Sequence, residues 1–218
     1  MNYLEKKKKA MLNYVSGSTP PIPSAYQQVE WIGSSGTQYI NSLYGIGEDY
    51  SLTKLEYTAE ILDTNGWKVS GIGNSPIASC YVGRQSQRVV YGRNSIDTPT
   101  SIPYNNEKRT FIVDYKNGVT ALYDNDTEIG SVTFTPPTPV LMTTTIYLFG
   151  YNDQRGAKAV LHSAKYYSYK IYNDDVLERN FIPCYRKSDH EIGMYDTVTQ
   201  TFYTNSGSGT FTKGNDVN

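Results

Sequence analysis

From Tyr26 onward, hydrophobic and polar positions alternate with a period of two or form short apolar runs between turn residues. This pattern is typical of antiparallel strands with one or both faces covered. The clearest unit, Arg109 to Phe134, contains three such segments, 110–115, 119–123 and 128–134. The pair Asn117-Gly118 lies between the first two, and both residues tolerate the positive φ of a tight hairpin. The sequence therefore predicts a three-stranded meander here.

Shorter segments predict the remaining strands. They are residues 57–62, 67–72, 80–83, 88–92, 144–151, 160–172, 176–185, 192–195 and 201–203. About a dozen strands without a second helical segment favour an all-β fold, a two-sheet antiparallel jelly-roll sandwich. A sandwich of this length commonly forms one unit, so we expect a single domain over residues 25–218.

Residues 1–24 differ from the rest of the chain. Apolar residues in this segment fall on one helical face, Lys6 to Lys9 form a basic run, and Ser16 to Pro23 is rich in Gly, Ser and Pro. A helix of about 15 residues is marginal alone in water, so we expect an N-terminal arm and hinge ordered by docking on a partner or another copy. The alternative is a solvated tail. The anchoring residues would be Leu4, Lys6, Lys7, Met11, Leu12 and Val15.

Composition limits the classes of partner. The formal net charge of −1 gives no general electrostatic argument for nucleic acid or an anionic membrane. The chain has no apolar run of about 18 residues and no apolar stretch after its N-terminal lysines, so we expect a soluble product without a secretion signal. Cys80 and Cys184 are too few for a disulfide framework and are expected to be reduced core residues.

The candidate catalytic patterns have simpler structural explanations. Asp124, Asp126 and Glu128 would share one face of a strand, as glycosidase carboxylates do, but they fall where a hairpin must reverse, so we interpret them as a turn. His162 and His190 are not within metal-binding spacing of each other or of a cysteine. No nucleophile elbow, phosphate-binding loop or dinucleotide fingerprint occurs in the sequence. We therefore expect no enzyme activity.

Sugar binding is the function that composition favours, because it uses aromatic rings beside Asn, Asp and Arg side chains. The chain has 21 tyrosines. The alternative for each ring is packing in the core or over a sheet edge. Asn152 and Asp153 are the residues that would supply oxygen ligands to calcium, but such pairs are more often simple turns, and we expect no cofactor. The candidate ligand-binding residues, which cluster on two neighbouring predicted strands and their rims, are Trp67, Tyr81, Arg84, Tyr91 and Arg93.

Two ends of the chain resemble a known family. The segment from Tyr26 to Ile40, YQQVEWIGSSGTQYI, resembles the opening strand pair of concanavalin A-like, laminin G-type domains of phages and prophages of Gram-positive gut bacteria. The closing segment of that group is similar to three stretches here, RNFIPCYR (179–186), GMYD (193–196) and FYTNSGSGTF (202–211). Between them, residues 146–149 and 164–172 match its late strands.

The resemblance covers roughly residues 26–214 and implies a jelly-roll sandwich of two antiparallel sheets. It also implies a virion protein of a tailed phage, made in the host cytoplasm and displayed on the particle as a head decoration, head fibre or tail component. The arm would then contact other virion proteins, and the sandwich would face host-surface polysaccharide or mucus. Homo-oligomers such as trimers suit a fibre, although no heptad run specifies them.

Three alternatives remain open at this point, since the fold hosts several functions. The chain could be a structural decoration without a glycan ligand, or a bacterial surface adhesin, which the missing signal disfavours. A glycan hydrolase is disfavoured because the carboxylate motif of the glucanase branch is absent.

Overall fold

The fold was analysed in a computed structural model. The residues it describes are 22–62, 70–73, 79–82, 87–91, 94–97, 107–133, 135, 136, 138, 139, 141, 142, 144–153, 160, 161 and 163–218. Only the backbone is described for 70–73, 79–82, 87–91, 94–97, 120, 122, 132, 151, 153, 160 and 161.

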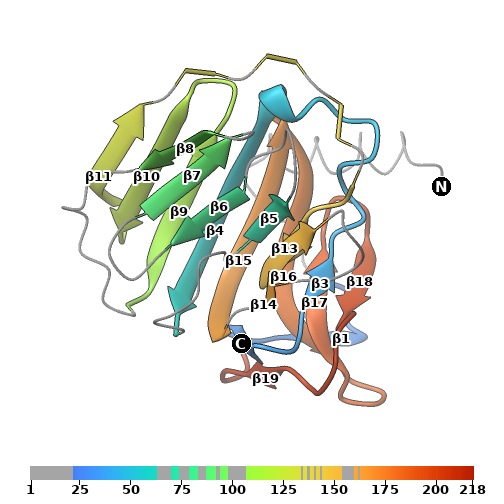
Figure 1. Ribbon diagram of the computed structural model, residues 1–218. Coiled ribbons are helices and arrows are strands. Elements are labelled where there is room, and N and C mark those ends of the chain that lie inside the picture. The colour runs from blue at the N-terminus through green and yellow to red at the C-terminus, as the bar shows by residue number, and fades with distance from the viewer. Residues whose placement is uncertain are drawn as a thin grey trace.

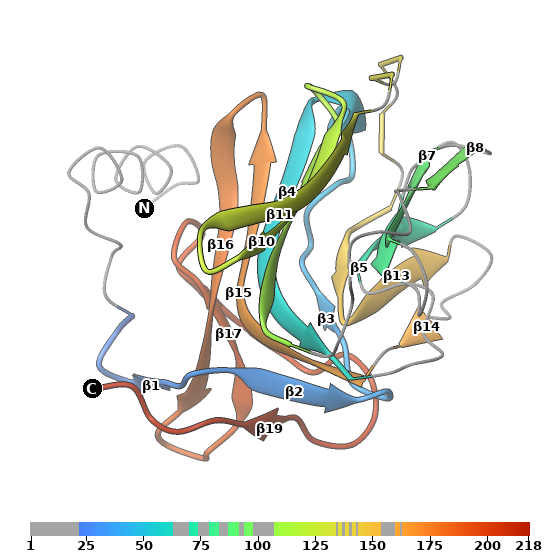
Figure 2. The same cartoon turned by 90° about the vertical axis from the view of Figure 1, so that its left-hand side faces the viewer.

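These residues form two β-sheets packed face to face, with the larger sheet on the left of Figure 2 and the smaller one on the right. The main path of the larger sheet contains, in spatial order, β11 (Thr127–Thr133), β10 (Val119–Asp124), β9 (Arg109–Asp114), β4 (Thr53–Ile61), β15 (Ser163–Asn173), β16 (Val176–Arg186), β17 (Ile192–Asp196) and β18 (Thr201–Thr204). Three short strands join this sheet, β1 (Tyr26–Gln28), β2 (Ile32–Ser35) and β19 (Thr212–Lys213).

The smaller sheet covers one face of the larger sheet (Figure 1). Its main path contains β14 (Val160–Leu161), β13 (Gly150–Asp153), β5 (Ser70–Gly73), β6 (Ser79–Val82), β7 (Gln87–Tyr91) and β8 (Asn94–Asp97). Two further strands lie off that path, β12 (Tyr147–Leu148) and β3 (Ile40–Asn41). One 3₁₀ turn, η1 (Tyr50–Leu52), precedes β4.

Strict alternation along β4 explains the position of the core. Every second residue from Thr53 to Ile61 is buried, and the residues between them are half-buried on the opposite face. Because successive side chains of a strand point to opposite faces, Leu55 and Tyr57 face the smaller sheet, whereas Glu56 and Thr58 face outward. The same strand therefore contributes to the core and to the outer surface of the larger sheet.

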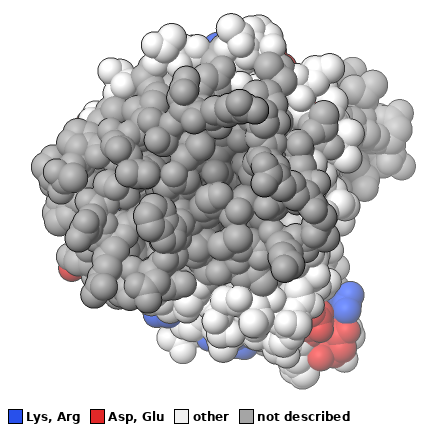
Figure 3. Space-filling model, viewed as in Figure 1, with Lys and Arg blue, Asp and Glu red and all other residues white. Residues whose placement is uncertain are grey.

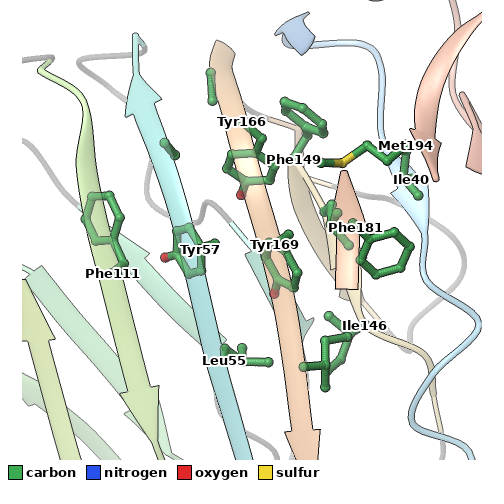
Figure 4. Packing of buried hydrophobic residues seen from close by; sticks show 14 of the residues in the cluster. Ile40, Leu55, Tyr57, Phe111, Ile146, Phe149, Tyr166, Tyr169, Phe181 and Met194 are labelled. Atoms are coloured by element: carbon green, nitrogen blue, oxygen red, sulfur yellow. The ribbon is translucent and has the colours of Figure 1, made fainter. Parts of the chain in front are cut away.

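Aromatic rings fill the centre of this core (Figure 4). Tyr57 lies between Phe111 and Tyr169, with ring centroids 5.1 and 5.2 Å away and both interplanar angles 14°. Phe149 stacks on Tyr166 with a centroid separation of 4.3 Å. Stacked rings bury a large area and add about 0.5–1.5 kcal/mol per pair beyond that burial. The many tyrosines of the sequence thus include several core residues.

Both ends of the sandwich segment belong to the larger sheet. The opening strand β1 pairs with β16, with Tyr26 opposite Arg186, and β2 lies between β15 and β19. At the closing end, Asp196 is fully buried and accepts hydrogen bonds from the backbone of Asn180 and Val198, at 2.9 and 3.0 Å. The residues that carry the family resemblance are therefore neighbours in space, and they include buried structural groups.

The predicted all-β sandwich is confirmed, and so is the meander of β9, β10 and β11. Its first turn differs from the expectation. Asp114 pairs with Val119, so the loop has four residues, 115–118, and only Gly118 adopts a positive φ, 63°. The Asp114 carboxylate accepts the backbone N–H of Asn117 at 2.9 Å, which stabilises this four-residue loop in place of the expected reversal over residues 116–118.

The segment 144–151, predicted as one strand, is divided in two. Phe149 adopts a φ of 66° and buries its ring in the core, which separates β12 from β13. As a result β12 runs antiparallel to β5, whereas β13 runs parallel to it, with Gly150 opposite Ser70. The smaller sheet therefore contains one parallel pair that the alternation pattern did not predict.

Two further features bear on the sequence predictions. Cys184 is buried and free, and burial raises the pKa of its thiol to about 12, so the thiol is neutral at physiological pH. The side chain of Cys80 lies outside the described residues. Within the described part of the chain, no helix has the length and apolar character needed to span a membrane.

Candidate functional site

An open groove of about 360 Å³ lies on the outer face of the larger sheet. Its floor is formed by β4, β9 and β15, and one wall is the turn between β10 and β11. Figure 2 shows this hairpin curling toward the outer side of the sheet, away from the smaller sheet. The lining residues are Thr58, Lys108, Arg109, Thr110, Asn125, Asp126, Tyr167 and Ser168.

The hairpin curls because of its local geometry. The register shifts where Leu122 pairs with Gly130 and Tyr123 with Glu128, so Ile129 is the extra residue of a bulge in β11, and bulges increase the twist of a strand. Asn125 and Asp126 then form a two-residue turn with φ values of 42° and 66°. Positive φ at both central residues is the geometry of a tight turn whose twist matches that of the flanking strands. This places the amide of Asn125 and the carboxylate of Asp126 beside the groove.

The floor of the groove is a surface of hydroxyl groups. Thr58 and Thr110 are opposite each other on β4 and β9, and their Oγ1 atoms are 2.8 Å apart in a hydrogen bond. Ser168 of β15 is opposite Thr58 on the other side of β4. Hydroxyl groups both donate and accept hydrogen bonds, so this floor suits a ligand that is itself rich in hydroxyls.

Tyr167 supplies the aromatic ring of the groove. It is the extra residue of a bulge in β15, because Tyr166 pairs with Ala59 and Ser168 pairs with Thr58. Its hydroxyl donates a hydrogen bond to Glu60, whose other carboxylate oxygen pairs with Lys165 at 2.8 Å. Burial, followed by the neighbouring Glu60, raises the pKa of Tyr167, which keeps the phenol protonated. The ring is thereby held in one orientation.

Two cations lie at the end of the groove. Arg109 has a side chain only 12% exposed and pairs with Glu107 and, at 3.0 Å, with Asp124. This second pair joins the start of β9 to the end of β10 and thereby holds the hairpin. Lys108 lies over the ring of Tyr167, with Nζ 4.4 Å from the centroid, a cation–π contact. A ligand that stacks on this ring must displace Lys108.

The lining of the groove contains hydroxyls, one amide, one carboxylate and one aromatic ring. Among the residues that line it, Asp126 is the one carboxylate, and glycoside hydrolysis ordinarily uses two. The nearby Asp124 and Glu60 are engaged by Arg109 and by Lys165. Four hydroxyls, an amide, a carboxylate and a ring are the groups that recognise a neutral sugar.

A group of charged residues away from the groove belongs to a structural turn. Figure 3 shows basic and acidic residues together at the lower right, where the hairpin of β16 and β17 reverses. There Arg186 pairs with Asp189, with Nη2 2.7 Å from the carboxylate, and this pairing lowers the pKa of Asp189. His190 follows in the same turn with a φ of 60°. These charges neutralise one another, so they do not define a second site.

The ligand-binding and anchoring residues predicted from the sequence have no described side chains. Trp67, Arg84 and Arg93 lie outside the described residues, and Tyr81 and Tyr91 belong to β6 and β7 with their side chains outside the description. The arm residues Leu4, Lys6, Lys7, Met11, Leu12 and Val15 also lie outside it. Both sets remain predictions.

Two other predictions fall on described residues. The interpretation of Asp124–Glu128 as a turn is confirmed, because Asp124 pairs with Thr127 across the reversal. The Asn152 side chain donates a hydrogen bond to the Thr145 carbonyl at 3.0 Å, and the described residues contain no group of three His, Cys, Asp or Glu side chains that could hold a metal ion.

Sequence reasoning missed the groove. One signal was available: the doublet Tyr166-Tyr167 interrupts the alternation of β15, and such an interruption can mark a bulge that points the second ring outward. The wall formed by Asn125 and Asp126 depends on the curl of the hairpin, which no local pattern specifies.

Comparisons with known proteins bear on the fold. No family model matches the chain, and no curated protein matches it in sequence. Among solved structures, a protein of Bacteroides ovatus that is proposed to bind carbohydrate is similar with a TM-score of 0.58 at 12% identity. The match covers 88% of this chain, and the chain spans 62% of the length of that protein.

Two weaker likenesses have TM-scores below 0.5. The CBM40 module of the Ruminococcus gnavus IT-sialidase, solved with α2,3-sialyllactose, has a TM-score of 0.47 and 16% identity over 69% of this chain and 92% of that one. The heptameric SAP-like pentraxin of Limulus polyphemus has a TM-score of 0.46 and 11% identity over 70% and 76%. The likeness that bears on the architecture is the one to the Bacteroides ovatus protein, and at 12% identity it shows the fold alone, an all-β jelly-roll sandwich.

Proposed function

We propose that this chain is a non-catalytic glycan-binding module that holds a hydroxyl-rich sugar in the groove between the β10–β11 turn and the outer face of β4, β9 and β15. The observation that carries this proposal is the lining of the groove, with hydroxyls on its floor and a fixed ring at Tyr167. The volume, about 360 Å³, lies at the small end of ligand sites and suits one or two sugar rings.

The fold supports the same proposal, because the Bacteroides ovatus protein with the same architecture is proposed to bind carbohydrate. The charge balance supports a neutral sugar. Arg109 is paired with two carboxylates, and the remaining charges of the lining, Lys108 and Asp126, are opposite in sign.

The test is a glycan array with the purified chain, followed by calorimetric titration of the sugars that bind. Tyr167→Ala should weaken binding about tenfold, the effect of losing roughly 1.4 kcal/mol of ring contact. Tyr167→Phe keeps the ring and should lose less. Asp126→Ala should weaken binding as well, because its carboxylate accepts sugar hydroxyls.

A matched control is Tyr185→Ala, which removes a half-buried tyrosine on β16 whose hydroxyl contacts Asp216 away from the groove. It should leave affinity unchanged. A different outcome would rule out the groove: the affinity for a sugar is unchanged in Tyr167→Ala, and binding is abolished in Trp67→Ala or Tyr91→Ala. The ligand would then use the surface predicted from the sequence.

We further propose that the module is displayed on the particle of a tailed phage and attached through residues 1–24, with host-surface glycan or mucus as its ligand. The family resemblance of residues 26–40 and 179–211 supports this proposal. Cryo-electron microscopy of intact particles should find the chain on the head or tail, and deletion of residues 1–24 should abolish its incorporation. Detection of the chain on uninfected bacteria would instead favour a bacterial adhesin.

A further inference from the structure

Three large apolar side chains are exposed on two adjoining loops, and none of them lines the groove. Leu43, Ile46 and Leu141 are 64%, 72% and 63% exposed, the highest values among the large hydrophobic residues that the structure describes. The two loops are joined by a bridge between Asp49 and Leu141. A further backbone hydrogen bond of 2.9 Å runs from Gly47 to the carbonyl of Met142. Leu43, Ile46 and Leu141 are therefore exposed on two loops that are bonded to each other, and we call these three residues the loop patch.

The loop patch is held rigidly. Ser42 donates its backbone N–H and its hydroxyl to the carbonyl of Ile146, at 3.0 and 2.6 Å, and Ile146 donates its own N–H to Tyr44 at 2.8 Å. At Gly45 the φ is 133°, and a Cβ would lie 2.5 Å from the Thr144 carbonyl oxygen. The backbone bonds on both sides of the loop thus fix its shape, and glycine is required at its closest approach.

Leu43 adopts a conformation that normally disfavours its side chain. Its φ is 53°, in the left-handed region that costs a non-glycine residue roughly 1–2 kcal/mol. The side chain of the next residue, Tyr44, is buried, and Arg179 lies over its ring at 5.4 Å. The strained conformation of Leu43 therefore occurs where its own side chain is exposed and the side chain of Tyr44 is buried. Strained backbone positions cluster at functional sites.

The surroundings of the loop patch are acidic. Glu48 and Asp49 lie in the same loop, and Glu178 lies beneath it near Tyr44. Burial raises the pKa of Tyr44, and the charges of Glu48 and Glu178 raise it further, whereas Arg179 opposes them. Three carboxylates against one guanidinium leave this corner negative.

The size of the loop patch limits what can cover it. Three partly exposed aliphatic side chains supply on the order of 300–400 Å² of apolar surface. A stable interface between folded partners buries about 800 Å² on each side, so the loop patch alone cannot hold a face-to-face dimer. It suits a slender partner with a few apolar anchors, such as an amphipathic helix.

The chain itself carries a segment with this chemistry. Leu4, Met11, Leu12 and Val15 have the spacing of one helical face, and Lys6 to Lys9 supply positive charge opposite in sign to the corner around the loop patch. We propose that residues 4–15 of one copy dock on the loop patch of a second copy, with the apolar face on Leu43, Ile46 and Leu141 and the lysines near Glu48 and Asp49. This contact is head-to-tail, so it generates a chain of copies in which one terminal arm stays free for the attachment proposed above, whereas a closed ring would leave none.

Sedimentation velocity over a range of concentrations tests the proposal with the full chain. The wild type should associate, and higher salt should weaken the association because charges contribute. A triple variant, Leu43→Asn, Ile46→Ser and Leu141→Ser, should sediment as a monomer, with Asn chosen because it tolerates the φ of Leu43. Deletion of residues 1–15 should also give a monomer. Leu62→Ser, at another partly exposed aliphatic position, is the matched control and should associate like the wild type.

Mixing the two monomeric variants is the decisive step. The triple variant keeps its arm and the deletion variant keeps its loop patch, so together they should form a one-to-one complex. No complex in the mixture would mean that the arm of one copy does not bind the loop patch of another, which overturns the proposal. A wild type that stays monomeric, or a deletion variant that still associates, overturns it as well. Melting curves of both variants confirm that they are folded.

Discussion

The two faces of β4, β9 and β15 differ in chemistry, although successive residues of the same strands point to opposite faces. The inner face carries Tyr57 stacked between two rings, whereas the outer face carries Thr58 hydrogen-bonded to Thr110. Outer-face pairs such as Lys170 with Glu56, at 2.6 Å, are half-exposed and contribute little to stability. One step along the strand therefore separates two roles: the odd positions of β4 are buried in the core, and Thr58 at an even position lines the groove.

The largest effect is expected on the inner face. Tyr57→Ala should destabilise the protein by about 3–5 kcal/mol, because it removes a fully buried ring and leaves a cavity between Phe111 and Tyr169. Thr58→Ala, one residue further, should cost less than about 1 kcal/mol and should weaken glycan binding instead. Urea unfolding measures both changes.

Equal stability losses at these two positions would contradict the separation of roles. Sugar binding serves as the second readout: at a temperature where Tyr57→Ala remains folded, its affinity should match that of the wild type, because the ring does not reach the groove.

The alternation that separates the faces is also what made the fold predictable. Residues 57–62 and 110–115 were recognised as strands because their apolar residues recur every second position. The same pattern failed at Phe149, where a single positive φ redirects the chain and creates the parallel pair of β13 with β5. The packing of the Phe149 ring in the core determines this backbone dihedral, and a single dihedral leaves no periodic pattern in the sequence.

The groove was much less predictable than the fold. Thr58, Thr110 and Ser168 are unremarkable outward-facing residues in sequence, and they meet only through the register of three strands that are distant in the chain. Asn125 and Asp126 were correctly interpreted as a turn, but their position beside Tyr167 requires the bulges in β11 and β15. Long-range register and bulges, which sequence patterns specify poorly, therefore assemble this site.

An intermediate effect is expected where the hairpin is tied to the sheet. Arg109→Ala removes the partner of Asp124 and frees the β10–β11 turn from the start of β9. Stability should fall by about 1 kcal/mol, since the pair is partly buried and joins two strands that are already paired. Sugar affinity should also fall, by more than this small loss of stability would cause, because the β10–β11 turn that forms the wall of the groove is no longer held in place.

Lys108→Ala is the matched control for that experiment, since it removes a neighbouring cation that contacts the Tyr167 ring and makes no tie to the hairpin. It should keep the stability of the wild type. Because Lys108 covers the ring that the sugar would stack on, this variant should bind a neutral sugar as well as the wild type or better. A loss of affinity would show that the ammonium contacts the ligand directly.

The smallest effect concerns pH and the outer face. Burial would raise the pKa of Glu60, but hydrogen bonds from Lys165 and Tyr167 outweigh it and lower that pKa below its ordinary value of 4.5. A carboxyl whose pKa is lower in the folded state stabilises the protein above pH 4.5, and this contribution is lost as the pH falls through the folded pKa. The side chain is partly exposed, so the contribution should stay below about 1 kcal/mol.

Urea unfolding of the wild type and of Glu60→Gln between pH 7 and pH 3 measures this contribution. The difference between their free energies of unfolding removes the contributions of the other carboxyl groups, which both proteins share. The wild type should be the more stable protein at pH 7, and the difference should shrink below pH 4.5. Sugar affinity should decline over the same interval, because Tyr167 loses the charged acceptor that orients its ring. Glu56→Gln breaks the pair with Lys170 on the same face without touching Tyr167, so its affinity should follow that of the wild type. If affinity is independent of pH while stability changes, the ring does not need Glu60 to bind sugar, and the outer face acts through its hydroxyls alone.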